Sequence, residues 1–187
     1  MGQLFQLLEK KTGSTQGAYE AISEVATRLG ASNLGAMDES LAGLALCVRG
    51  ERIETVSKHL TWRDFERFCS NVLRAKGFRV RENIYLRKPR AQIDVLGTSD
   101  RFSLAIDCKH WARTSGEGTL AKLVETQKGR ARRLHDSLDF VSPIVPVIVV
   151  LTDGGARLLS GGAVVPIFAV GDFLDSVDSL TESLDFV

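Results

Sequence analysis

The sequence lacks the apolar segments that mark membrane and secreted proteins. Its longest apolar run, IVPVIVVL at 144–151, contains Pro146 and is far shorter than the roughly 20 residues that a membrane span needs. The first residues, MGQLFQLLEKK, have no basic start followed by a long apolar stretch, so they do not match a secretory signal. We therefore expect no association with a membrane.

Cysteine and histidine signatures are also missing. The three cysteines stand at 47, 69 and 108 and match neither a zinc-ligand spacing nor a disulfide framework. The histidines at 59, 110 and 135 form no ligand spacing either. Scattered free thiols suit a reducing compartment, and the cytoplasm is the expected location. The chain has no glycine-rich phosphate loop, which argues against action on small phosphorylated molecules.

What the chain does have is a strongly cationic middle. Residues 58–133 carry 18 Lys or Arg against 8 Asp or Glu, which is net +10. Residues 1–57 carry 5 against 7 (net −2), and residues 134–187 carry 1 against 8 (net −7). Such segregation is typical of a surface that faces a polyanion, because Lys and Arg displace counterions from phosphates. The alternative is a solvated face that the acidic last third neutralises.

Apolar periodicity divides the chain into two parts. It predicts two short helices within 3–29, whereas 34–60 fits either a helix or a strand. We assign 1–58 to a helical amino-terminal extension and 59–187 to a second domain. Near the start of this domain, Thr61 precedes a run of residues with apolar side chains at helical spacing. Asp64 is the third residue of the predicted helix, and Gly77 follows its end. This pattern predicts a capped amphipathic helix.

The rest of the second domain alternates strands and helices. Three predicted strands at 78–86, 91–97 and 102–110 are separated by short turns, which favours antiparallel neighbours. A helix at 119–139, strands at 143–152 and 163–170, and a helix from about 172 follow. The order predicts an α/β fold with a mixed sheet, in which strands reached through a helix enter in parallel.

The segment SLAIDCKHW at 103–111 places charged side chains inside an apolar strand. Side chains alternate along a strand, so Asp107 and Lys109 share a face, and Asp94 on the preceding strand is close enough to meet them. Two carboxylates and an ammonium are costly to desolvate unless a divalent cation organises them, and carboxylate oxygens suit Mg²⁺ or Mn²⁺. The alternatives are a cross-strand ion pair on a solvated face and, for Asp94, a turn residue.

In chain order, Glu66, GF at 77–78, IDV at 93–95 and DCK at 107–109 resemble the PD-(D/E)xK nuclease superfamily. The stretch DCKHW, with the later VPVIVVLTDGGARLL, is most similar to Mrr-type restriction endonucleases, and AQIDVLG is similar to archaeal Holliday junction resolvases. The resemblance covers about residues 60–178. It implies a restriction-endonuclease-like three-layer core, with a central mixed β-sheet flanked by helices.

The same resemblance implies a role for each residue of the motif. Asp94 and Asp107 would bind Mg²⁺ or Mn²⁺ with help from the backbone carbonyl of Cys108. Lys109 would be the catalytic lysine, and Glu66 would assist the metal or its water shell. Glu66 on its own could be an exposed helix residue, but its i+4 relation to Trp62 and its neighbour Phe65 place it near the buried edge, which favours the functional role. The sequence departs from the pattern in having isoleucine before the first acid, where proline is expected, and aspartate as the second acid, where glutamate is commoner.

Basic residues of the cationic middle are the candidate DNA contacts. The cluster KGRARRL at 128–134 is either a solvated helix face or a phosphate-contacting ridge, and the regional charge favours the ridge. Gln127, just before it, resembles a glutamine often found on this helix of related nucleases and is a further catalytic candidate. The candidate DNA-binding set is Lys88, Arg90, Arg113, Lys128, Arg130, Arg132 and Arg133.

Together these features predict a Mg²⁺- or Mn²⁺-dependent DNA endonuclease of restriction or DNA repair and recombination type. The alternative is a catalytically inactive nucleic-acid-binding module of the same fold, although a pure binder gains nothing from carboxylates near phosphate. Cleavage of both strands by one site per chain calls for two chains, so we expect a homodimer. The preferred DNA structure stays open among junctions, duplexes, methylated sites and flaps.

Overall fold

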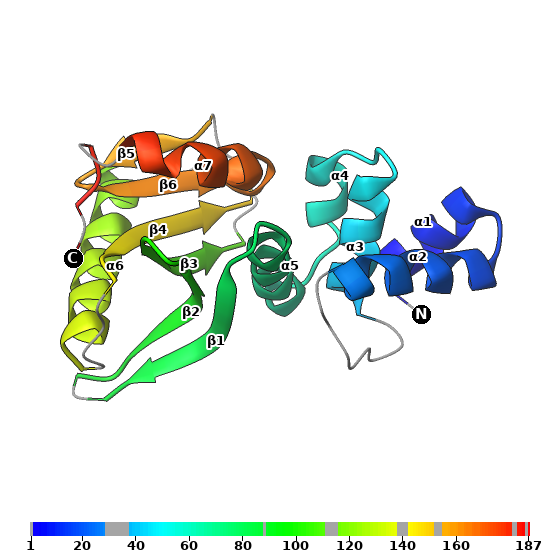
Figure 1. The fold of residues 1–187 in the computed structure, drawn as a ribbon. Coiled ribbons are helices and arrows are strands. Elements are labelled where there is room, and N and C mark those ends of the chain that lie inside the picture. Colours follow the sequence, from blue (N-terminus) through cyan, green and yellow to red (C-terminus); the bar gives the residue numbers. More distant parts are fainter. Residues whose placement is uncertain are drawn as a thin grey trace.

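The computed structural model describes residues 2–28, 38–87, 89–110, 116–137, 142–151, 155–180, 183–185 and 187. Within them, six strands form one sheet (Figure 1). The strands are β1 (Arg79–Leu86), β2 (Ala91–Thr98), β3 (Ser103–Lys109), β4 (Ile144–Val150), β5 (Arg157–Leu159) and β6 (Gly162–Pro166). Their order in the sheet is β1-β2-β3-β4-β6-β5.

The sheet is mixed, as the sequence predicts. Strands β1, β2 and β3 are antiparallel neighbours because short turns join them. Helix α6 (Glu117–Ser137) connects β3 to β4, and β3, β4 and β6 run parallel. Strand β5 pairs with β6 in an antiparallel hairpin. The predicted α/β class is confirmed.

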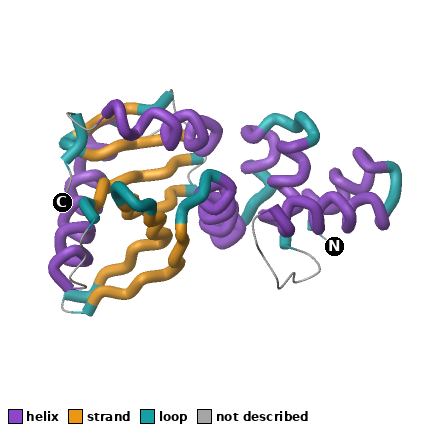
Figure 2. Tube along the Cα trace, in the orientation of Figure 1, coloured by secondary structure: helices purple, strands orange, loops and turns teal. Residues whose placement is uncertain are grey.

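Helices cover both faces of the sheet and make three layers (Figure 2). On one face, Leu120 and Val124 of α6 pack against Ile148 and Val164 of the sheet. On the other face, α5 (Trp62–Ala75) and α7 (Val170–Ser176) share one apolar cluster with the alternate residues of β3 and β4. No helix in the described ranges has both the length and the apolar content needed to cross a membrane.

Helix α5 links the sheet to the amino-terminal helices. It begins with a capping box: Thr61 Oγ1 accepts from the amide of Asp64 at 3.3 Å, and the Asp64 carboxylate accepts from the amide of Thr61 at 3.2 Å. Phe65 and Phe68 are fully buried below it. After the helix, Gly77 has a φ of 85°, a left-handed conformation that glycine adopts without strain. The predicted capped helix is confirmed.

The described residues of the amino-terminal part form helices joined by short turns, with no strand among them. It contains α1 (Gln3–Thr12), α2 (Thr15–Arg28), α3 (Glu39–Val48) and α4 (Ile53–Ser57), so the ambiguous stretch from 38 onward forms helices. The Glu39 carboxylate accepts from the amides of Leu4 and Phe5 at 2.8 and 3.2 Å, which joins the starts of α1 and α3. Helix α3 packs against α5 (Figure 1). The boundary between 1–58 and 59–187 stays a prediction.

The predicted strand at 163–170 is wrong in its second half. Strand β6 ends at Pro166, where its last pair with β4 is Val150. Val150 is the last residue of β4, so β6 has no pairing partner on β4 beyond Pro166. The chain continues as the 3-10 helix η1 (Ile167–Ala169) and then α7. A second 3-10 helix, η2 (Val177–Leu180), follows. The three-residue β5 was not predicted from the sequence.

Candidate active site

The β1–β2 hairpin changes faces at Asn83 and Asp94. Val95 packs in the apolar cluster beneath α5, whereas Ile93, two residues earlier, packs in the cluster beneath α6. A regular strand would direct both side chains to one face. Asn83, opposite Asp94, has a φ of 53°, and the paired residues of β1 and β2 skip this position. The hairpin therefore bends at Asn83 and Asp94, which lie between two paired positions, and Figure 1 shows β1 and β2 curving together.

Strands β2 and β3 separate at the same place. Their last pair is Val95 with Ile106, and the next residues in register would be Asp94 and Asp107. The Asp94 carboxylate instead accepts a hydrogen bond from the amide of Cys108 at 2.8 Å. This bond satisfies an amide that the separating strand leaves free, and it holds Asp94 beside the next strand.

Asp107 is almost enclosed and has a cation on each oxygen. Its side chain is 6% exposed, with Oδ2 2.6 Å from Lys109 Nζ and Oδ1 3.0 Å from the guanidinium of Arg130. Gln127, which is fully buried, accepts from Arg130 at 3.3 Å and donates to the carbonyl of Ala105 at 3.0 Å. Gln127 thus joins α6 to β3 and orients Arg130, and its recorded hydrogen bonds go to neither site carboxylate.

Glu66 approaches the site from α5. It lines an open cavity of about 350 Å³ between α5 and β1, together with Asp94. The other lining residues are Trp62, Arg63, Arg67, Glu82, Asn83 and Tyr85. Four of the residues expected at the catalytic centre are therefore brought together at one bend of the sheet. They are Glu66 of α5, Asp94 of β2, and Asp107 and Lys109 of β3.

The carboxylates of this site repel one another. Burial, and then the nearby Asp94, Glu82 and Asp107, raise the pKa of Glu66 from 4.5 to about 7, against the opposing effect of Lys109. Burial also raises the pKa of Asp94, and the negative charge of Asp107 adds to this, although the Cys108 amide and the cations oppose it. An additional positive charge would stabilise the ionised form of such partly buried, mutually repelling carboxylates.

Carboxylate oxygens at this bend suit Mg²⁺ or Mn²⁺ better than zinc. Among the described residues, no three His, Cys, Asp or Glu side chains lie close enough to form a metal cage. Mg²⁺ needs no such cage, because it usually binds one or two carboxylates, waters and a substrate phosphate. A hydrogen bond with the Cys69 thiol, and burial, raise the pKa of the Cys108 thiol well above its usual value. The Cys108 thiol is therefore held in its neutral form in the metal-free protein.

Lys128 lies elsewhere. It was a candidate DNA contact, but its ammonium is 3.1 Å from Glu125, 3.0 Å from Asp185 and 2.9 Å from the carbonyl of Ser160, and the residue is buried. These contacts direct the charge into the protein. The Lys128 ammonium is therefore already engaged by protein groups and does not face a DNA backbone.

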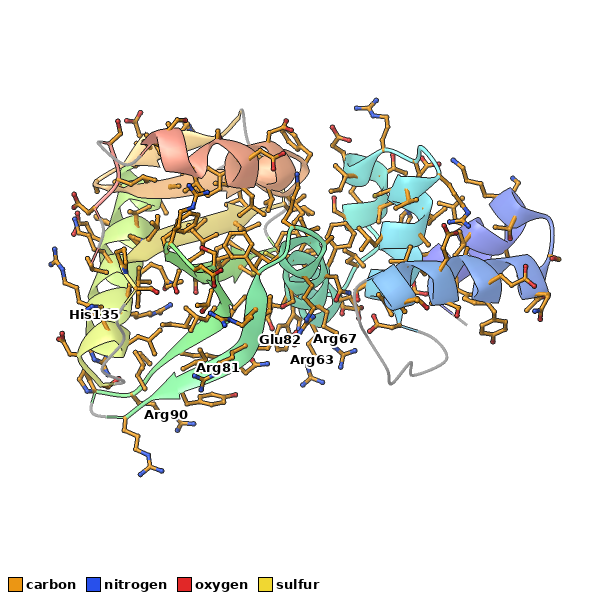
Figure 3. All side chains as sticks on the ribbon, viewed as in Figure 1. Arg63, Arg67, Arg81, Glu82, Arg90 and His135 are labelled. Carbon is orange, nitrogen blue, oxygen red and sulfur yellow. The ribbon has the colours of Figure 1, made fainter. Side chains whose placement is uncertain are left out.

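The other candidate DNA contacts are dispersed. Arg90 is exposed at the end of the β1–β2 hairpin (Figure 3), and Arg132 is exposed on α6. Arg133 donates to the carbonyl of Pro89. Lys88 and Arg113 lie outside the described residues.

Arg130 belongs to the site rather than to a DNA-binding ridge. The basic cluster at 128–134 predicts a single DNA-facing surface, whereas in the structure Arg130 pairs with Asp107. The available signal was its spacing: Arg130 follows Gln127 by three residues, and residues three apart on a helix share a face.

A family comparison bears on this arrangement. Residues 57–135 match the family model described as restriction endonuclease, Mrr_cat. The match covers less than half of the chain, and over this segment it is consistent with the restriction-endonuclease-like PD-(D/E)xK superfamily. Neither the curated proteins nor the solved structures gave a match to the chain.

The matched segment contains the whole candidate site. It includes α5, β1, β2, β3 and most of α6, and therefore Glu66, Asp94, Asp107, Lys109 and Gln127. The resemblance stated from the sequence is confirmed for these residues of the chain. The restriction-endonuclease-like domain points to a nuclease, with DNA as the implied substrate.

Proposed function

We propose that the protein is a Mg²⁺- or Mn²⁺-dependent DNA endonuclease that hydrolyses phosphodiester bonds. The observation that supports this most strongly is the 2.6 Å pair of Asp107 and Lys109 at the point where β2 and β3 separate. Asp94, on the amide of Cys108, is at the same point. Acids and an ammonium gathered at an opening in a sheet are arranged for a charged substrate rather than for packing.

In this proposal Asp94 and Asp107 hold the cation, and the Cys108 carbonyl and Glu66 assist. When bound, the cation supplies positive charge to a phosphate oxygen and makes a bound water more acidic. Asp107 already has a cationic side chain on each oxygen, so metal binding replaces part of this pairing. The raised pKa values of Glu66 and Asp94 support the same assignment, since both acids are short of a counter-charge.

Lys109 lies where its ammonium group can bind the attacking water. Its side chain is 24% exposed, whereas that of its partner Asp107 is 6% exposed. An ammonium carries three donors, and Asp107 takes one of them. The remaining donors can hold a water or a phosphate oxygen, and they stabilise negative charge as it develops there. Gln127 acts as a positioning residue through Arg130.

Plasmid cleavage tests this proposal. With Mg²⁺, we expect wild type to cut supercoiled plasmid, and Asp107→Asn and Lys109→Ala to lose cleavage while circular dichroism and DNA binding are preserved. Lys122→Ala is the matched control, because Lys122 is exposed on α6. Undiminished cutting by both site variants would reject the assignment. Wild type that binds plasmid but leaves it intact with Mg²⁺ and with Mn²⁺ would favour the inactive binding module.

We also propose a homodimer. One site per chain cuts one strand, so two chains are needed for coordinated cleavage of a duplex. Light scattering after gel filtration should give a mass near twice the 20.4 kDa of the chain. A monomer that also nicks plasmid without linearising it would contradict the dimer and leave the endonuclease proposal in place.

A further inference from the structure

The cavity between α5 and β1 has aromatic walls that the proposed cleavage chemistry does not use. Trp62, at the start of α5, is 56% exposed, and Tyr85 of β1 is 63% exposed. They are the two most exposed large hydrophobic residues in the described part of the chain. Both line the cavity that also contains Glu66 and Asp94. Aromatic faces grouped beside a polar site are typical of a surface on which a flat ligand stacks.

The acids that line the cavity disfavour a phosphate beside them in the metal-free protein. Glu66, Glu82 and Asp94 all line it, with Glu82 paired to Arg74 at 2.8 Å, and a phosphate placed against Glu66 and Asp94 without a bound cation would be repelled. A neutral nucleobase meets no such repulsion. Its face can stack on an aromatic ring, and the N–H groups that base pairing would otherwise use, such as N3–H of an unpaired thymine, can donate to carboxylate oxygens.

Two exposed arginines of the cavity can contact the phosphate next to a bound base. Arg63 and Arg67 are exposed residues of α5 that line the same cavity, beside Glu82 of β1 (Figure 3). The Arg63 guanidinium is 5.1 Å from the centre of the Trp62 ring, which orients both side chains. Partly buried acids and exposed arginines line one cavity, which suits one nucleotide with its base against the acids and aromatic rings and its phosphate at the arginines.

We propose that this cavity binds an unpaired nucleobase, so that the substrate class of the restriction-endonuclease-like domain is DNA with unpaired nucleotides beside the cleavage site. A base stacked within an intact duplex cannot enter such a pocket unless it leaves the helix. Because Glu66 and Asp94 belong both to the cavity and to the proposed metal site, a base bound there places its own phosphodiester next to that site. The cleavage part of this inference rests on the proposed function.

Binding measurements in EDTA test the cavity without cleavage. Fluorescence anisotropy would compare a blunt duplex, the same duplex with a bulge of unpaired nucleotides, and oligo-dT. Stacking of one base is worth about 1–3 kcal/mol, so we expect Trp62→Ala and Tyr85→Ala each to weaken binding of bulged DNA and oligo-dT by roughly 5- to 150-fold. Binding of the blunt duplex should change less than about twofold. Phe168→Ala, an exposed aromatic of η1, is the control and should change none of these affinities.

A fluorescence signature separates stacking from a loss of structure. The chain has two tryptophans, so Trp62→Phe leaves one. We expect oligo-dT to quench the tryptophan emission of wild type. Trp62→Phe should keep most of the affinity for oligo-dT, because phenylalanine still stacks, but should lose most of the quenching. Full quenching in Trp62→Phe would overturn the assignment of Trp62 to the base.

The outcomes for the cavity and for cleavage are distinguishable. Equal weakening of blunt and bulged DNA by Trp62→Ala and Tyr85→Ala would mean a duplex contact and would overturn the base-binding cavity, as would no weakening at all. If the selective weakening is found but wild type cuts no DNA with Mg²⁺ or Mn²⁺, the endonuclease proposal fails and the cavity stands. If wild type cuts DNA and both variants bind unpaired DNA normally, the cavity fails and the endonuclease stands.

Discussion

Replacing Arg130 by glutamine removes the guanidinium that lies 3.0 Å from Oδ1 of Asp107. In the metal-free protein this cation occupies an oxygen that the proposed metal would use. We therefore expect Arg130→Gln to bind Mn²⁺ or Mg²⁺ more tightly than wild type. The same change leaves a nearly buried carboxylate with one partner fewer, so the metal-free variant should lose about 1–3 kcal/mol of unfolding free energy.

The gain in affinity follows from the geometry of the pair. Two unit charges about 4 Å apart interact by about 4 kcal/mol at an effective dielectric constant of about 20. The Arg130 side chain is 27% exposed and Lys109 remains on the other oxygen of Asp107, so solvent and the lysine reduce the effect. Competition worth a third to a half of that energy, about 1.4–2 kcal/mol, corresponds to roughly 10- to 30-fold tighter binding of the cation.

Titration calorimetry with Mn²⁺ in the absence of DNA measures this change directly. Arg132→Gln is the matched control, since it removes the same charge from an exposed position on α6. A thermal-shift series in EDTA and in Mg²⁺ gives a second readout, in which Arg130→Gln should gain more from the metal than wild type does. If Arg130→Gln binds Mn²⁺ no more tightly than Arg132→Gln does, Arg130 does not compete with a metal for Asp107.

Three further predictions concern the framework of the site. Gln127→Met keeps the shape of the side chain but leaves the Ala105 carbonyl without its donor, and urea unfolding should show a loss of about 1–3 kcal/mol; a loss below about 0.5 kcal/mol would contradict it. The pKa of Glu66 is raised from 4.5 to about 7, so ionisation weakens the fold as the pH rises through this range. In EDTA, Glu66→Gln should match wild type at pH 4 and, after solvent screening of a half-buried side chain, be more stable by about 1 kcal/mol at pH 8; equal stability at both pH values would refute this. Asn83→Ala should cost about 1 kcal/mol at its φ of 53°, whereas Asn83→Gly should stay within about 0.5 kcal/mol, and equal losses would contradict the account of the bend.

Local sequence patterns predicted the elements that carry the site. The capping pair Thr61 and Asp64 depends only on residues three apart, and it defines the start of α5 in the structure as it does in the sequence. The alternation of side chains along 103–109 is equally local, and it places Asp107 beside Lys109. The order of strands and helices gave the mixed sheet for the same reason, because short turns and a helical crossover restrict how strands can pair.

Features that depend on contacts between distant segments escaped prediction. The bend at Asn83 and Asp94 arises where the outer half of the hairpin packs under α6, and no period in β1 or β2 reveals it. Arg130 turns inward because Asp107 and Gln127 attract it, whereas composition alone placed it with its basic neighbours. Strand β6 stops at Pro166 because its partner β4 ends, which the apolar run continuing past it does not indicate.

The most direct test of the central claim is the cleavage rate as a function of Mg²⁺ concentration, measured under single-turnover conditions on end-labelled DNA for wild type and Asp94→Asn. The account predicts no cleavage by wild type in EDTA, a rate that rises and saturates with Mg²⁺, and for Asp94→Asn a rate lower by about 100-fold or more at every Mg²⁺ concentration. Cleavage by wild type in EDTA, or an unaltered Mg²⁺ dependence in Asp94→Asn, would contradict it.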